Sequence, residues 1–209
     1  MIAKYIRCEV AEAKKGIFSK GQRLWLETAH CEGFISQLGG WEQETNIAVI
    51  LARWTDMESV KDFMSAAHDP IAERANQVGS YSHISVSYLS AVMCIRAFNQ
   101  GGKNQASCGF IRIADCCIDP DKLDEFIQEL KTLWNPGMQQ VEGMLGGQLW
   151  QFNDESDRYL VTTYWESEAA HRHYMAEYFP RLKQQAATDI IHTISGHNIQ
   201  TEPSWRVIP

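Results

Sequence analysis

The sequence lacks the apolar run of roughly 20 residues that crosses a membrane, and its first residues lack the long apolar region of a secretory signal peptide. Positive charge is also scarce, with 19 Lys and Arg against 26 Asp and Glu and a formal net charge of −7. A protein that binds the phosphate backbone needs a basic face, which this balance disfavours. With only 6 prolines and 14 glycines in 209 residues, a fibrous or disordered chain is not expected either. We expect a globular cytoplasmic protein that binds neither nucleic acid nor membrane.

Familiar catalytic and metal-binding motifs are missing as well. The sequence contains no HExxH, no Walker loop, no GxSxG and no CxxC. His192 and His197 are five residues apart on an expected strand, which places them on opposite faces. Of six cysteines, the adjacent Cys116 and Cys117 would likewise point to opposite faces of a strand. We therefore expect reduced thiols, mostly buried, and no metal site.

The chain contains an internal repeat. Tyr5-Ile6-Arg7 recurs as Phe110-Ile111-Arg112 at an offset of 105, and Trp54 recurs as Trp165 at an offset of 111. Five further matches occur in the same order at offsets of 109 to 111: Leu24-Trp25, Glu32-Gly33-Phe34, Phe63-Met64, Ile84-Ser85 and Arg96 with their counterparts. We interpret the sequence as two copies of one module, residues 1–98 and 108–209, joined by a polar, Gly-rich linker at 99–107.

Each copy shows the same order of expected elements. Alternating or continuous apolar residues predict four strands in each copy: Ile2–Val10, Phe34–Trp41, Ile47–Trp54 and Tyr81–Ser90, then Gly109–Ile118, Met144–Phe152, Arg158–Trp165 and Ile191–Gln200. Further extended segments, Ala91–Phe98 and Thr201–Ile208, close the two copies. A helix is expected after each first strand and each third strand. In the second copy, Leu123, Phe126, Ile127 and Leu130 form one helical stripe.

Capping residues mark where these helices begin. Asp119 precedes Pro120 and is expected to cap the first helix of the second copy. Thr55 and Glu58 have the spacing of a capping box before the second helix of the first copy. The element order is therefore βαββαβ twice, an α+β class. The ferredoxin-like plan places both helices on one face of a four-stranded antiparallel sheet. Because the bare sheet face must be covered, we expect the two sheets to pair with each other as an intrachain pseudo-dimer.

The turns and strand ends resemble a known superfamily. Glu32-Gly33-Phe34 and Glu142-Gly143-Met144 resemble its turn after the first helix, and Trp54 and Trp165 resemble its Trp at the end of strand three. The chain thus resembles a duplicated antibiotic-biosynthesis-monooxygenase-like domain of the dimeric α/β-barrel superfamily. The resemblance implies an eight-stranded barrel with helices outside and pockets between each sheet and its helices. It also implies small-molecule chemistry of several kinds, including cofactor-free quinone-forming oxygenation, haem degradation and isomerisation.

Two features of the family pattern are missing from this sequence. The family's monooxygenases and haem-degrading enzymes carry an Asn on the first strand, which neither copy has. The haem-degrading enzymes carry a His about ten residues after the Trp, where this chain has Met64 and Met175. Haem is therefore the weaker of the possible ligands, and we expect no cofactor. His68 lies on the same helix at another spacing and is kept as a candidate ligand-binding residue.

The candidate site residues cluster in the second copy. His171 stands where the first copy has Val60, and a titratable ring on an apolar stripe is typical of a pocket. We expect His171 to act as a general base toward a phenolic or enolic proton and Tyr174 to donate a hydrogen bond to the oxyanion. Trp165 and Met175 would form apolar walls. Trp54, Arg53 and Tyr164 are further candidate ligand-binding residues, with Arg53 and Tyr164 on the strand face opposite the tryptophans.

These patterns leave three functions open. The chain is a cofactor-free monooxygenase-like protein that acts on a small aromatic or lipophilic metabolite, a non-catalytic small-molecule-binding or structural protein, or a haem binder. Isomerase chemistry is a fourth, narrower alternative. The expected partner is a small molecule, and the chain could also form a further homo-oligomer.

Overall fold

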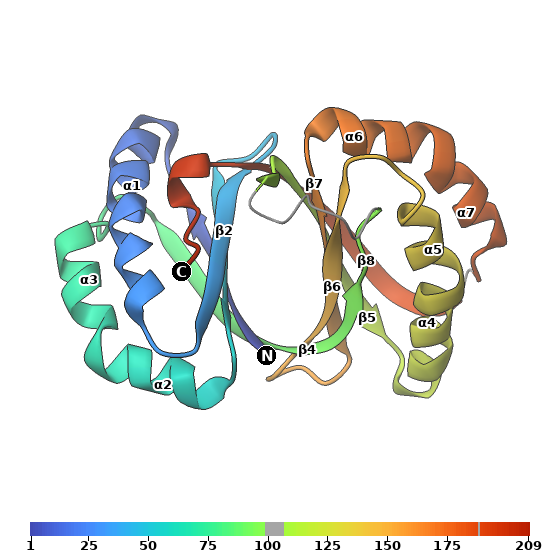
Figure 1. The fold of residues 1–209 in the computed structure, drawn as a ribbon, viewed down its shortest axis with the longest axis horizontal. Helices are drawn as coiled ribbons and strands as arrows, with labels where there is room; N and C mark the ends of the chain where they lie inside the picture. Colours follow the sequence, from blue (N-terminus) through green and yellow to red (C-terminus); the bar gives the residue numbers. More distant parts are fainter. Residues whose placement is uncertain (99–106, 188) are drawn as a thin grey trace. The chain divides into compact units, whose positions relative to one another are not determined.

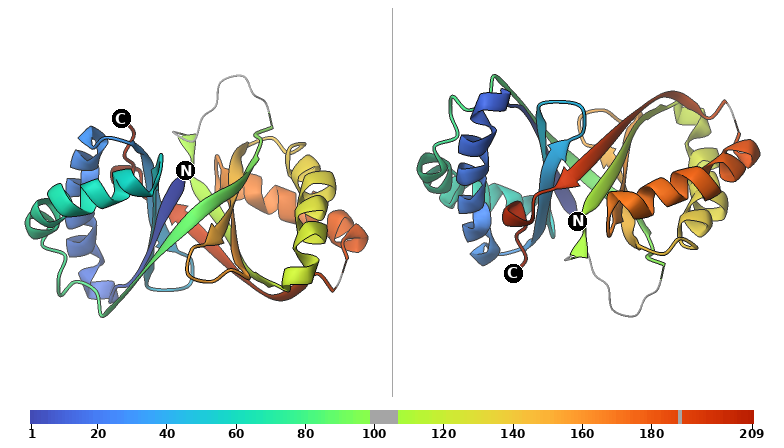
Figure 2. Two further views of the ribbon diagram at one scale, coloured as in Figure 1. Left: turned by 90° about the horizontal axis from the view of Figure 1, so that it is seen from below. Right: turned by 90° about the horizontal axis from the view of Figure 1, so that it is seen from above.

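The structure, a computed structural model, describes residues 1–98, 107–187 and 189–209 (Figure 1). The described chain divides into two compact units. The first consists of Met1–Ser90 with Ile199–Pro209, and the second of Ala91–Asn198. Each unit contains an antiparallel sheet with helices on one face, as the views in Figure 2 show. The mixture of helices and antiparallel strands expected of the predicted α+β class is observed, whereas the predicted linker at 99–107 lies outside the described residues except for its last residue.

The sheet of the first unit has the strand order β4–β1–β3–β2. Its strands are β1 (Ile2–Glu9), β2 (Phe34–Glu42), β3 (Ile47–Trp54) and β4 (His83–Ile95). β3 pairs with β1 and β2, and β4 pairs with β1, all in antiparallel register. Residues 91–95, expected as a separate extended segment, continue β4 without a break and belong to the second unit.

The helices of the first unit follow β1 and β3. They are η1 (Glu12–Lys14), α1 (Lys15–Gln22), η2 (Arg23–His30), α2 (Met57–Ala66) and α3 (His68–Ala75). The cap of α2 is Asp56, one residue after the predicted Thr55: its Oδ1 accepts a hydrogen bond from the Ser59 N–H at 2.9 Å. This bond and a second one from the Ser59 hydroxyl lower the pKa of Asp56. The predicted helix is correct, and its first turn is satisfied by the neighbouring side chain.

The second unit repeats this order of elements. Its strands are β5 (Phe110–Ile118), β6 (Met144–Phe152), β7 (Arg158–Trp165) and β8 (Ile191–Thr201), in the order β8–β5–β7–β6. Its helical segments are η4 (Pro120–Lys122), α4 (Leu123–Glu129), η5 (Leu130–Trp134), α5 (Asn135–Met138), α6 (Glu168–His173), η6 (Tyr174–Tyr178) and α7 (Phe179–Gln185). η5 and η6 are single π-helical turns. Asp119 stands at the predicted N-cap but makes no side-chain cap hydrogen bond.

The C-terminal residues pack in the first unit. Residues 199–201 of β8 pair with β2, and Val207 exchanges backbone hydrogen bonds with Gln37. A short helix, η7 (Pro203–Trp205), buries Trp205 completely. The Trp205 ring contacts those of Phe18 and Trp41 at centroid distances of 5.6 and 5.2 Å. The core of the first unit is thus completed by the last residues of the chain.

Strand pairing corrects the repeat alignment of the first strands. In β1, Ile2 lies opposite Trp54, and in β5, Phe110 lies opposite Trp165. The equivalent of Ile2 is therefore Phe110, at an offset of 108 instead of the predicted 105. An odd shift of three residues moves every side chain to the other face of the strand. The residue that corresponds to Arg112 is Lys4, which the sequence alignment did not consider.

No helix among the described residues is long and apolar enough to span a membrane. All six cysteines are free of disulfides, and Cys8, Cys108 and Cys116 are buried. Burial raises the pKa of the Cys8 and Cys116 thiols to about 12, so both stay protonated near neutral pH. These thiols act as small core residues.

Candidate functional site

A cavity of about 440 Å³ lies within the first unit, between its sheet and its helices. This volume is in the range of small-molecule sites. Its wall is mostly apolar and comes from β1, β3 and β4 on one side and from α1, η2, α2 and α3 on the other. The lining includes the sequence candidates Trp54 and His68. The prediction of a pocket between a sheet and its helices thus has a counterpart in the first unit.

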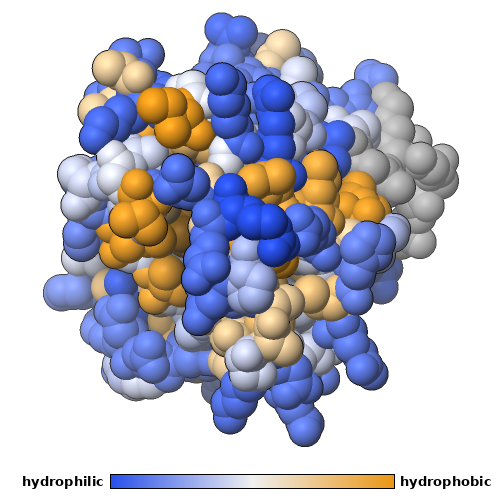
Figure 3. All heavy atoms as spheres, turned by 90° about the vertical axis from the view of Figure 1, so that its left-hand side faces the viewer, coloured by the Kyte–Doolittle hydropathy of each residue, from blue (hydrophilic) through white to orange (hydrophobic). Residues whose placement is uncertain are grey.

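Strand alternation selects the residues that face this cavity. On β1 they are Lys4, Ile6 and Cys8, which lie opposite Tyr88, Val86 and Ile84 of β4. Ile84 and Val86 are 43% and 44% exposed although they line the cavity, so it is open to solvent along β4. Figure 3 views the first unit from its helical side, where hydrophobic patches alternate with hydrophilic side chains. The exposed apolar residues of α1 and η2 are Ile17, Leu24 and Leu26.

Aromatic rings form the inner wall of the cavity. The Trp54 ring contacts Phe63 at a centroid distance of 4.8 Å, and Phe63 contacts His68 at 5.7 Å. His68 also lies 5.4 Å from Trp25, and its Nδ1 is 2.8 Å from the Asp69 carboxylate. Trp25 is held by a hydrogen bond from its Nε1 to Gln77 at 2.9 Å. A planar apolar molecule could therefore stack against these rings.

One cation lines the cavity. Lys4 is 6% exposed, and its Nζ lies 3.2 Å from the Met64 sulfur and 5.8 Å from the centroid of the Phe63 ring. Burial lowers the pKa of Lys4 to about 8. Lys4 is not among the site residues predicted from the sequence, because the predicted repeat alignment is three residues out of register on the first strand. The pairing of the first strand with the Trp strand would have identified it.

Arg53 lies on the sheet face opposite the cavity. Its Nε and one Nη donate hydrogen bonds to Ser36 Oγ at 2.8 and 2.6 Å. This agrees with its predicted strand face, and it places Arg53 outside the cavity lining. Its predicted role in ligand binding is therefore not supported by proximity to this cavity.

In the second unit the predicted residues Trp165, His171 and Tyr174 lie together. The His171 ring stacks on Phe110 at 5.1 Å and meets Trp165 edge-on at 5.4 Å, while Tyr174 contacts Trp165 at 5.3 Å. Each of these side chains is at most 5% exposed. The cluster is closely packed aromatic core, and the catalytic roles of His171 and Tyr174 stay predictions.

Burial sets the ionisation of this cluster. It lowers the pKa of His171 to about 4, and the nearby Arg112 charge adds to the effect. Burial also raises the pKa of Tyr174, against the influence of Arg112. His171 is therefore neutral at pH 7, and its Nε2 is buried without a hydrogen-bond partner among the described residues. A neutral imidazole could accept a proton, but its low pKa makes it a weak base.

The remaining candidates of the second unit lie elsewhere. Tyr164 is buried on the sheet face opposite Trp165, where its hydroxyl oxygen is 3.3 Å from Thr162 Oγ1. Met175, predicted as an apolar wall, is 36% exposed at the surface of the unit. The residues predicted to form one site in the second unit thus lie in three places: the aromatic core, the opposite sheet face and the surface.

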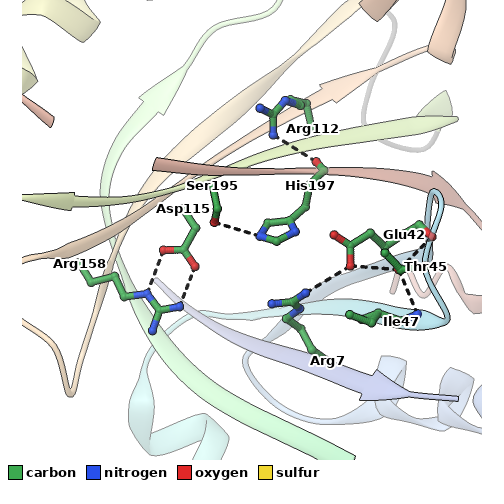
Figure 4. Close-up of polar contacts among 9 residues, drawn as sticks. All are labelled: Arg7, Glu42, Thr45, Ile47, Arg112, Asp115, Arg158, Ser195 and His197. Atoms are coloured by element: carbon green, nitrogen blue, oxygen red, sulfur yellow. Dashed lines mark hydrogen bonds and ion pairs between the residues drawn. The ribbon is translucent and has the colours of Figure 1, made fainter. Parts of the chain in front are cut away.

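A second, polar pocket of about 280 Å³ also belongs to the second unit. Figure 4 shows the Arg158 guanidinium making two hydrogen bonds to the Asp115 carboxylate, at 2.9 and 2.7 Å. Arg158 also donates to Glu155 at 2.7 Å. Ser195, which lines the same pocket, lies 3.4 Å from His197 Nε2. Each charged group here already has a partner, so the pocket carries no free charge for a ligand.

Two family models match separate parts of the chain. Residues 2–89 match a domain of unknown function, DUF4937, and residues 110–179 match the antibiotic biosynthesis monooxygenase family. The uncharacterized protein YdbC of Bacillus subtilis is 36% identical over 90 residues, which are 42% of this chain and 76% of that protein.

Two solved structures share the fold over almost the whole chain. One is a protein of Lactobacillus acidophilus provisionally named a monooxygenase, with a TM-score of 0.74 and 12% identity over 99% of this chain and 95% of that one. The other is an anthrone oxidase-like protein, with a TM-score of 0.66 and 12% identity over 96% of this chain and 91% of that one. At these identities the likeness concerns the fold alone.

Proposed function

The chain contains a DUF4937 domain at residues 2–89 and an antibiotic biosynthesis monooxygenase domain at residues 110–179, and on this premise we propose a cofactor-free monooxygenase-like function. Its substrate or ligand would be a small aromatic or lipophilic molecule held in the cavity of the first unit. The observation that carries the proposal is the 440 Å³ cavity itself, whose aromatic wall includes the family's strand-three Trp, Trp54.

The cavity offers what cofactor-free oxygenation requires of a protein. Trp54, Phe63 and Trp25 provide flat apolar surfaces that position an aromatic ring. For an anthrone, one dioxygen molecule inserts one oxygen at the CH₂ carbon, which loses two hydrogens, and the second oxygen leaves as water. The substrate is oxidised by four electrons and dioxygen is reduced by four, so no external reductant is needed.

We expect binding and turnover to depend on the open volume of the cavity. Ala72 of α3 lines the cavity, and Ala72→Phe would fill part of it. Ala66 is exposed on α2, so Ala66→Phe adds the same ring without touching the cavity. Oxygen uptake would be measured with an anthrone and a panel of hydroquinones, and binding by isothermal titration calorimetry. Ala72→Phe should lower affinity about tenfold and Ala66→Phe less than about twofold, because only the first removes binding volume.

Three outcomes separate the candidate functions. Oxygen uptake that Ala72→Phe suppresses supports the proposal, and binding without oxygen uptake favours the non-catalytic alternative. An absence of both overturns a ligand site in this cavity. The same assay on His171→Val tests the sequence-based prediction that the second unit carries the catalysis.

Haem is the alternative ligand to test in parallel. His68 is the one histidine among the described residues that line the cavity, and a carboxylate on Nδ1 is a common partner for a metal-binding imidazole. His68 would hold the iron, and bound haem would supply redox chemistry with dioxygen. Titration with haemin, followed by the Soret band in wild-type protein and His68→Ala, distinguishes this case. We expect no specific band, because Met64 occupies the position at which the family's haem-degrading enzymes carry their His.

A further inference from the structure

Lys4 is a buried cation without a carboxylate partner. It lies on β1 and is 6% exposed, and no acidic residue pairs with it in the part of the chain that the structure describes. Its two neighbours, the Met64 sulfur at 3.2 Å and the Phe63 ring at 5.8 Å, are weak partners for an ammonium group. Removing a cation from water is unfavourable unless a partner of opposite charge compensates for the lost hydration. The free protein therefore holds a charge that it does not neutralise itself.

The other residues of the cavity wall also leave the positive charge of Lys4 uncompensated. Among the described residues, the titratable ones that line it are Lys4, Cys8, His68, Tyr81 and Tyr88, and none of them is an Asp or Glu. These residues come from β1, the start of α3, and the segment that leads into and includes β4. An anion that entered the cavity would meet a cation and no competing carboxylate.

A second donor in the same lining also lacks an acceptor. The Trp54 Nε1 atom is buried without a hydrogen-bond partner among the described residues. Its counterpart in the second unit, Trp165 Nε1, donates to Thr163 Oγ1 at 3.0 Å. Lys4 lies opposite Ala52 in the strand register, and Arg112 lies opposite Thr163. Ala52 thus occupies the position of Thr163, whose hydroxyl is the acceptor in the second unit. Because Ala52 has no hydroxyl, the Trp54 indole N–H has no acceptor there.

The second unit also satisfies its own cation. The Arg112 guanidinium donates to the backbone carbonyls of Ile113 and His197 and lies against Gly196. Equivalent positions therefore hold a cation that is bonded within the protein in one unit and a cation aimed at an open cavity in the other. The difference points to a ligand in the first unit and to core packing in the second.

We propose that the cavity of the first unit binds its ligand as an anion, with an ionised oxygen held by Lys4 Nζ and the Trp54 indole N–H. The inference rests on the proposed function and specifies its substrate class: a small aromatic compound with an oxygen that ionises near neutral pH. A phenol or enol bound in this way is held as its phenolate or enolate, the electron-rich form that reacts with dioxygen. Lys4 would then contact the substrate directly.

A pair of probes that differ in charge tests this inference. 2-Naphthoate and 2-naphthamide have the same ring system and nearly the same size, but only the first is an anion. Their binding to the full chain would be measured by calorimetry at pH 7 for wild type, Lys4→Met and Lys61→Met. Lys61 is an exposed lysine of α2, so its variant loses one charge outside the cavity.

We expect the wild type to prefer naphthoate by about tenfold or more, as a buried charge pair warrants. Lys4→Met should abolish the preference and Lys61→Met should retain it. The preference should also fall as the pH rises above about 8, where Lys4 loses its proton, and should be independent of pH in Lys4→Met. Ala52→Thr, which copies the second unit, should weaken naphthoate binding severalfold by giving Trp54 an internal acceptor.

Each outcome has a defined meaning. Equal binding of the two probes by the wild type, or a preference that survives in Lys4→Met, overturns the anion inference and leaves the cavity as a neutral ligand site. Failure of both probes and of the oxygenase substrates to bind overturns the proposed function as well. If Lys4→Met does not fold, the wild-type preference and its pH dependence decide the question alone, and Lys4→Gln provides a second variant.

Discussion

At the scale of single residues, Lys4 of the first unit and His171 of the second are both buried titratable side chains, but their surroundings differ. Lys4 faces an open cavity, whereas His171 is surrounded by Phe110, Trp165 and Tyr174. Burial lowers the pKa of both side chains, because loss of hydration disfavours the charged, protonated form. Both shifts make the free energy of unfolding depend on pH.

Lys4→Met should stabilise the ligand-free protein below pH 8. The pKa of Lys4 falls from 10.5 to about 8 on folding, so between these values the unfolded chain binds more protons and wild-type stability rises with pH. Below pH 8 the full penalty applies, up to about 3 kcal/mol, and it fades toward pH 10.5. Urea denaturation of both variants from pH 7 to 10 measures the difference. A constant difference across this range would contradict the burial of a protonated Lys4.

His171→Val should flatten the acid side of the stability curve. The pKa of His171 falls from 6.5 to about 4 on folding, so wild-type stability is full above pH 6.5 and decreases as the pH falls toward 4. The loss from this group is up to about 3 kcal/mol. Val already occupies the equivalent, buried position 60, so the variant should fold. Urea denaturation at pH 7, 5.5 and 4.5 tests this, with His173→Val on the exposed face of α6 as the control.

At the scale of elements, the helices that follow each Trp begin in the same way from different residues. Asp56 caps α2 and Ser167 caps α6, each through its side-chain oxygen and the N–H three residues later. α6 carries His171 and leads into the π-helical turn that begins with Tyr174. The cap therefore fixes the start of the segment that packs against Trp165.

Ser167→Ala should lower the free energy of unfolding by about 1 kcal/mol, because the Ala170 N–H loses its acceptor at the first turn of α6. Ser156→Ala, in an exposed turn before β7, should change it by less than about 0.5 kcal/mol. Chemical denaturation of the two variants measures both values. Equal effects would mean that the Ser167 cap contributes nothing beyond an ordinary surface hydroxyl.

At the scale of the whole molecule, the two compact units do not follow the two sequence copies at their ends. Residues 91–95 continue β4 into the second unit, and residues 199–209 return to the first. The matched family regions, 2–89 and 110–179, lie inside the predicted modules of 1–98 and 108–209. The pairing of the two sheets within one chain stays a prediction.

Trp205→Ala should destabilise the first unit by about 3–5 kcal/mol, since it removes a fully buried ring that contacts Phe18 and Trp41. Ile208→Ala, at a position that is 50% exposed, should have little effect. Thermal and urea unfolding of the full-length variants test the difference. A loss below about 1 kcal/mol would show that the C-terminal segment does not complete this core.

The sequence by itself determined the repeat, the order of strands and helices, and the strand-three tryptophans. These features follow from periodicity and local capping, which act over a few residues along the chain. Only the tertiary structure determined which residues of the two first strands are equivalent. Offsets of 105 and 108 both align apolar residues with apolar residues, but they differ by three residues and therefore place each side chain on opposite faces of the strand. It also decided that Lys4 faces a cavity while Arg112 donates hydrogen bonds to backbone carbonyls of its own unit. Whether a site is open or filled depends on side chains from distant elements, such as Ala52 opposite Lys4 and Thr163 opposite Arg112, and no local pattern contains that pairing.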